Sequence, residues 1–148
     1  MSACLLAEDA PQWGQRHTRN MVSNEVGLPN EFDPKTGSNV KWSVPLGTRT
    51  YSSPIVAQGK VFIGTNNDRP RDSRHKGDRG VLMCFAEETG EFLWQLIVPK
   101  LDEELSYKDW PDVGIVSPPT VDADRAYLMD NRGTVLCLDV EGQHNGND

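Results

Sequence analysis

The sequence predicts an all-β protein of short antiparallel strands, and three observations favour this fold class. First, its 148 residues include 13 Gly and 10 Pro, a content that is typical of frequent turns. Second, apolar residues make up 36% of the chain and occur in short runs, none near the roughly 18 residues that span a bilayer. Third, a pattern of strands and turns occurs twice in the same order. Internal repetition is the strongest of the three signals.

The repeat becomes visible when two segments are aligned. Residues 53–63 read Ser-Pro-Ile-Val-Ala-Gln-Gly-Lys-Val-Phe-Ile, and residues 118–128 read Pro-Pro-Thr-Val-Asp-Ala-Asp-Arg-Ala-Tyr-Leu. Both contain proline, a short strand, a tight polar turn and a second strand. A third strand follows in each copy, at 80–86 and at 133–139, and a fourth strand at 91–98 completes the first copy. The fourth strand of the second copy is expected beyond the end of the sequence.

A turn and a strand of the same kind also occur upstream, at 33–37 and 39–45. Within the repeat, residues 61–63 and 81–83 are consecutive apolar residues, a pattern that indicates strands covered on both faces. Each blade of a β-propeller is covered in this way by its neighbours. The sequence therefore predicts a partial β-propeller of four-stranded antiparallel blades, with about two blades present and one lone outer strand.

The unit Ser-Pro-x-Val, an apolar strand, and a Thr-Gly turn followed by tryptophan resembles the repeat of pyrroloquinoline quinone (PQQ) enzymes. It also resembles the propeller lipoprotein of outer-membrane assembly. The resemblance covers about residues 40–142 and implies a bacterial protein that is periplasmic or secreted. In these propellers the repeated tryptophans dock between blades, so we expect this structural role for Trp42 and Trp94.

Three parts of the chain follow from this resemblance. Residues 1–10 are expected to be a signal-peptide remnant or a disordered end, because a short apolar stretch precedes Glu8 and Asp9. Residues 11–39 are a lead-in segment, and residues 40–148 are PQQ-like propeller repeats that we expect to be truncated.

The charge and the cysteines exclude several classes of function. The chain has 15 Lys and Arg against 22 Asp and Glu, and its net charge of −7 disfavours binding to nucleic acid. Cys4, Cys84 and Cys137 show no metal-type spacing. Packed sheets lie about 10 Å apart, which is too far for a disulfide between Cys84 and Cys137 in successive blades. Both are therefore expected to be buried free thiols.

No cofactor is evident in the sequence. The PQQ dehydrogenases that the repeat resembles hold calcium over the quinone, beside a pair of adjacent cysteines. This chain has neither that pair of cysteines nor a recognisable calcium loop. PQQ with calcium is expected only in a longer protein with more blades. His17, His75 and His144 are scattered among polar residues, so no metal site is expected.

Two insertions break the repeat, a basic one at 66–79 and an acidic, aromatic one at 100–114. In an up-and-down blade both should emerge at the same end as the linker 47–51. A charged and aromatic rim there suits recognition of a protein or ligand, whereas mutual packing of the loops through Arg–carboxylate pairs explains the same residues. The candidate binding-face residues are Arg49, Tyr51, Arg69, Arg71, Arg74, Tyr107 and Trp110.

The function that these features favour is non-catalytic. We expect an exported bacterial propeller segment whose loops bind a protein or a small molecule, and whose other partners are the remaining blades. The alternative is the N-terminal part of a PQQ-dependent quinoprotein oxidoreductase, with its catalytic residues in further blades. A third alternative is a segment without independent activity. No nucleic-acid partner, catalytic residue or transmembrane segment is expected.

Overall fold

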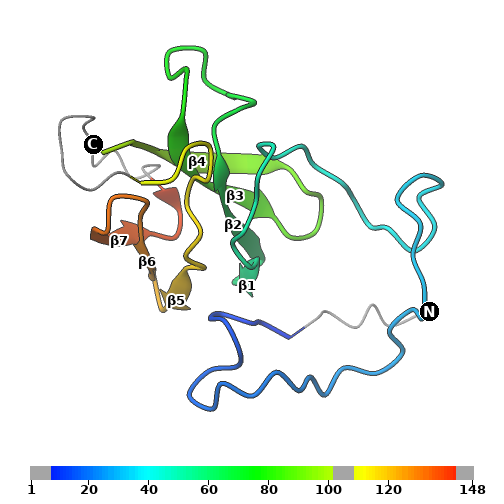
Figure 1. Cartoon of the computed structure of the whole chain (residues 1–148). Helices are drawn as coiled ribbons and strands as arrows, with labels where there is room; N and C mark the ends of the chain where they lie inside the picture. Colours follow the sequence, from blue (N-terminus) through cyan, green and yellow to red (C-terminus); the bar gives the residue numbers. More distant parts are fainter. Residues whose placement is uncertain (1–7, 102–108, 143–148) are drawn as a thin grey trace.

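A computed structural model describes residues 8–101 and 109–142. These residues form seven strands in two antiparallel sheets, one of four strands and one of three, and no α-helix (Figure 1). The predicted all-β class is confirmed. Within the described ranges there is no helix with the length and apolar character that crossing a membrane requires.

The first sheet has the order β1-β2-β3-β4, so each strand pairs with the next one along the chain. A two-residue turn connects β1 to β2, in which Gln58 and Gly59 have φ angles of 55° and 70°. Two positive φ values in succession match the twist of a hairpin. The strands are β1 (Ile55–Ala57), β2 (Lys60–Asn66), β3 (Arg79–Ala86) and β4 (Phe92–Pro99).

The second sheet repeats the first three strands of this arrangement, as β5 (Thr120–Asp122), β6 (Arg125–Met129) and β7 (Val135–Asp139). The register repeats as well. Ile55 lies opposite Phe62, which lies opposite Cys84, in the first sheet. Thr120, Tyr127 and Cys137 occupy the corresponding places in the second. Residues that are equivalent in the sequence repeat therefore also occupy equivalent positions in the strand pairing of the two sheets.

A core between the two sheets holds them together. Phe62, Leu82 and Cys84 of the first sheet are fully buried there, and they pack in one cluster with Val121 and Leu128 of the second. Full burial of a side chain such as Phe or Leu contributes about 1.5–3 kcal/mol each. The remaining buried members of this cluster are Ile55, Ala57, Val98, Ile115, Ala126 and Val140.

The opposite face of the first sheet is covered by the segment before it. Val44 and Leu46 pack on a buried cluster that includes Met83 and Phe85. The lone outer strand expected at 39–45 does not form, and this part of the prediction is wrong. The segment lies on the face of the sheet, where no strand edge is available for backbone pairing.

The outer face of the second sheet is exposed. Tyr127 lies opposite Cys137, Met129 lies opposite Val135, and all four residues are exposed. The sequence predicts buried thiols at both cysteines. That is correct for Cys84 and wrong for Cys137, because the described residues place no layer over this face of the second sheet.

Residues 9–16 connect the inner edges of the two sheets. Ala10 exchanges two backbone hydrogen bonds with Val56 of β1, and the carbonyl of Pro11 accepts a hydrogen bond of 2.7 Å from the backbone N–H of Val121 in β5. Figure 1 shows this blue segment passing beneath β1 and β5. We call residues 9–16 the strap, because they join both sheets at one end.

Candidate functional site

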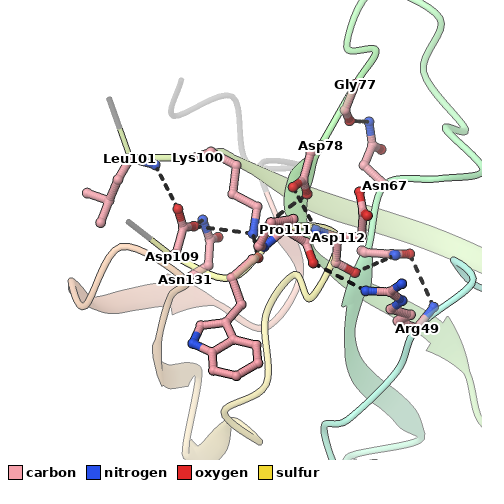
Figure 2. A network of polar contacts seen from close by, with 12 residues as sticks. Arg49, Asn67, Gly77, Asp78, Lys100, Leu101, Asp109, Pro111, Asp112 and Asn131 are labelled. Carbon is pink, nitrogen blue, oxygen red and sulfur yellow. Dashed lines mark hydrogen bonds and ion pairs between the residues drawn. The ribbon is translucent and has the colours of Figure 1, made fainter. Parts of the chain in front are cut away.

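Three loops meet at the end of the sheets opposite the strap, and we call them the loop cluster: residues 47–51, 66–79, and 99–119 without the undescribed residues 102–108 (Figure 2). Asn66, the last residue of β2, is their hub and is only 1% exposed. Its Oδ1 accepts from the Thr48 backbone N–H at 2.9 Å, and its Nδ2 donates to the Asp112 carbonyl at 2.7 Å. A buried amide needs such partners, so Asn66 fixes the relative positions of all three loops.

A second centre of the loop cluster is the ammonium of Lys100. It donates to the Trp110 carbonyl at 2.8 Å and lies 3.3 Å from Asp109 and 3.6 Å from Asp78. Asp78 in turn accepts a hydrogen bond of 2.7 Å from the backbone N–H of Asp112. Figure 2 shows these contacts linking the segment after β4 to the loop between β2 and β3.

The carboxylate of Asp109 is tied to three elements. It accepts from the Leu101 backbone N–H at 3.3 Å and from the Asn131 amide at 2.9 Å, besides its contact with Lys100. Burial raises the pKa of Asp109, but the Asn131 hydrogen bond and the Lys100 charge outweigh burial, so the pKa lies below its ordinary value. Asp109 is therefore ionised at neutral pH and serves as a fixed anchor.

Calcium does not fit this arrangement. The two carboxylates that approach each other, Asp78 and Asp109, share the ammonium of Lys100, which would repel a divalent cation. Across the described ranges, no three His, Cys, Asp or Glu side chains converge to form a metal site.

The structure places three of the candidate binding-face residues on exposed parts of the loop cluster. Arg49 donates to the Pro111 carbonyl at 3.3 Å, which connects the 47–51 linker to the residue after Trp110. Trp110 is 77% exposed and Tyr51 is also exposed. Trp, Tyr and Arg are the residue types enriched in binding hot spots.

The arginines of the basic insertion have different roles. The guanidinium of Arg71 lies 4.8 Å from the ring centre of Phe92 and donates to the Pro45 carbonyl, so it covers the face of the first sheet. Arg74 pairs with Asp72 in the same loop, and its hydrogen bonds lower the pKa of Asp72 to about 2. Arg69 is exposed, and Tyr107 lies outside the described residues.

Several residues that organise the loop cluster were not found by sequence reasoning, notably Asn66, Lys100 and Asn131. Their signals in the sequence are weak. Asn66 is a polar residue at the end of an apolar strand, and Lys100 is the first residue of an acidic insertion. Each could be assigned only when a second loop was in place, because each has at least one partner that is more than 20 positions away in the sequence.

The two tryptophans lie at the end of the sheets opposite the loop cluster. The Trp42 indole N–H donates to the Glu87 carbonyl at 2.7 Å, and that of Trp94 donates to the Val140 carbonyl at 3.1 Å. Each ring also lies directly against the glycine that closes the same turn. A Cβ at Gly90 would lie 2.7 Å from the Trp42 ring, and one at Gly142 would lie 2.8 Å from the Trp94 ring.

These contacts repeat one packing step. Segment 40–46 contacts the first sheet through Trp42 in the way that β4 contacts the second sheet through Trp94. The ring of Trp94 also packs edge-on against Phe62, with 5.9 Å between ring centres.

Comparisons of the sequence with family models and with curated proteins gave no match.

Proposed function

We propose that this chain is a non-catalytic β-propeller segment of an exported bacterial protein, and that its loop cluster binds a protein or a small ligand. The observation that carries the propeller assignment is the repeated tryptophan step. Twice in succession, a tryptophan of one layer donates its indole N–H to a backbone carbonyl of the next layer. Such a repeated contact fits equivalent sheets that are arranged radially, as in a propeller. The resemblance to PQQ-like repeats supports a periplasmic or secreted location.

The exposed face of the second sheet supports the same assignment. Tyr127 and Cys137 hold the register positions that Phe62 and Cys84 hold in the first sheet, where the second sheet covers them. A further sheet of the same kind is therefore the partner that fits this face. We propose that the remaining blades of the propeller are this partner.

The binding role is supported by the contrast between a fixed backbone and open side chains in the loop cluster. Asn66, Lys100 and Asp109 hold the loops through buried or half-buried polar contacts. The Trp110 and Tyr51 side chains project from that framework with most of their surface exposed. Pre-organised loops lose little conformational entropy on binding, so exposed aromatic residues on them are efficient contact groups.

Site-specific photo-crosslinking tests the binding role. A photoreactive amino acid is placed at Trp110 or at Tyr51 in cells of a bacterium that produces the protein. The matched control carries it at Glu88, an exposed turn residue at the opposite end of the first sheet. We expect a discrete adduct from the two loop positions that diminishes when Arg49→Ala is added. Adducts of equal yield at all three positions, or at none, would contradict the proposal.

A further inference from the structure

A pocket of about 410 Å³ lies at the opposite end of the molecule from the loop cluster, between the strap and two hairpin turns. The strap contributes Asp9, Gln15 and Arg16 to its wall. The β1–β2 and β5–β6 turns contribute Gln58 and Ala123. Pro11, Ala57 and Val121 complete the lining as its apolar part.

The wall of this pocket is held in place by contacts to both sheets. Besides the pairing of Ala10 with Val56, the Gln58 backbone N–H donates to Asp9 Oδ2 at 3.0 Å, which joins the strap to the first turn. The side-chain amide of Gln58 donates to the Ala123 carbonyl, which joins the first turn to the second. The pocket is thus bounded by three segments that fix one another.

The charged groups of the pocket are of both signs. The guanidinium of Arg16 pairs with Asp122 at 2.5 Å, but the two side chains are 48% and 70% exposed. An exposed pair of this kind contributes little to stability and exchanges readily with other ions. Arg16 has five N–H donors, and its contacts within the described residues use one of them. Asp122 therefore occupies the place that the carboxylate of a ligand would take.

We infer that the pocket binds a small zwitterion, an amino acid or a related aminocarboxylic acid. Its carboxylate displaces Asp122 from Arg16, its ammonium group lies at the Asp9 carboxylate, and its carbon chain contacts Pro11 and Ala123, the apolar lining residues that are not buried. Charge-assisted hydrogen bonds of this type are stronger than neutral ones. The ligand would also hold the strap to both turns, so binding should slow local opening of the strap.

Calorimetric titration with 4-aminobutyrate tests this inference, with butyrate and butylamine as probes that each lack one charge. Arg16→Gln should weaken binding of 4-aminobutyrate about tenfold or more, because a charged hydrogen bond is lost. Asp122→Asn should strengthen it several-fold, because the competing carboxylate is removed. The matched control is Arg132→Gln, an exposed arginine at the far end of the second sheet, which should leave affinity unchanged.

Hydrogen exchange of the wild-type protein locates the ligand. Residues 9–16 and the two turns should exchange more slowly with 4-aminobutyrate present, while the loop cluster should not change. Three results would overturn the inference: no saturable heat at the highest soluble concentration, binding weakened equally by Arg16→Gln and Asp122→Asn, or equal affinities for butyrate and 4-aminobutyrate. A failure of the loop-cluster proposal would leave these measurements unaffected, since the two sites lie at opposite ends.

Discussion

The two sheets have the same strand pairing but differ in burial. Phe62 in the first sheet is fully buried, whereas Tyr127, at the same position in the second, is 42% exposed. The first sheet has a layer on each face, formed by segment 40–46 and by the second sheet. Within the described residues, the second sheet has a layer on only one of its faces. Burial in this fold is therefore determined by neighbouring layers and not by the pattern of the strand itself.

The largest expected difference between the sheets is the reactivity of their cysteines. Cys84 is buried in the first sheet, and burial raises the pKa of its thiol to about 12, whereas Cys137 is exposed on the second. Cys137 should react with a thiol reagent at neutral pH, because its side chain is exposed. Cys84 should react only after unfolding, slower by about three orders of magnitude or more. Mass spectrometry of labelled peptides measures both rates, and similar rates would contradict the burial of Cys84.

The same thiol gives a pH dependence with a defined sign. The pKa of Cys84 is raised from 9.0 to about 12 on folding, so between these values the folded state retains a proton that the unfolded state loses. Its contribution to stability is complete below pH 9 and is lost as pH rises towards 12. Urea unfolding at several pH values should show a smaller alkaline loss for Cys84→Ala than for the wild type. Met129→Ala, which replaces an exposed residue of the second sheet without a titratable group, is the control and should show the alkaline loss of the wild type.

Truncation of equivalent aromatic residues should have the next largest effect. Phe62→Ala removes a fully buried ring and should lower the free energy of unfolding by about 3–5 kcal/mol. Tyr127→Ala removes a ring that is 42% exposed and has no layer over it among the described residues, and it should cost less, about 1 kcal/mol. Chemical denaturation compares the two variants, and Phe62→Leu preserves the comparison if Phe62→Ala does not fold. Equal losses would mean that the outer face of the second sheet is covered.

Alanine substitutions at two glycines distinguish the cost of a strained backbone conformation from the cost of a steric clash with a neighbouring ring. Gly90 and Gly133 both have positive φ, 71° and 79°, but only Gly90 lies against a ring, that of Trp42. Gly133→Ala should cost about 1–2 kcal/mol, the cost of a left-handed backbone with a side chain. Gly90→Ala should cost about 1–3 kcal/mol more, because its Cβ displaces the indole. Thermal unfolding of both variants tests this, and equal costs would show that Trp42 moves away freely.

The smallest expected effect is the loss of a single indole hydrogen bond. Trp94→Phe keeps an aromatic ring beside Phe62 but removes the donor to the Val140 carbonyl, and it should cost about 1 kcal/mol plus a small loss of packing. Trp42→Phe should cost about the same, because its bond to Glu87 repeats the interaction. The half-exposed Trp13→Phe is the control and should lie within about 0.5 kcal/mol of the wild type. A negligible effect at both docking positions would remove the main support for the propeller proposal.

Strand positions were predictable from the sequence because they depend on local chemistry. Proline precedes β1 and β5, and short polar turns separate apolar runs at the expected places. The expected strand at 39–45 failed because strand formation needs a pairing edge, and that is a property of the neighbouring layers. The exposure of Cys137 was missed for the same reason, since its strand resembles the buried one.

The candidate sites were less predictable than the strands. The meeting of the loops follows from strand order, and the exposed Trp110 belongs to an insertion that the break in the repeat had marked. The residues that hold the loops were not identified, because Asn66 binds partners 18 and 46 positions away. The strap pocket had no local signal at all. Arg16 and Asp122 are 106 positions apart and meet only through backbone pairing of the lead-in with both sheets.

The tryptophan contacts and the tight turns lie at one end of the sheets, and the long loops lie at the other. Insertion of a residue into the turn at Glu87–Gly90 would separate the carbonyl from the glycine that an indole contacts together, and would loosen the adjacent layer. Residues added between β2 and β3, or after β4, would leave the two tryptophan contacts unchanged, because neither contact involves these loops. Evolution can therefore lengthen and diversify the loop cluster without altering the joint between repeats, so new surface accumulates at one end while the geometry of the repeat is inherited intact.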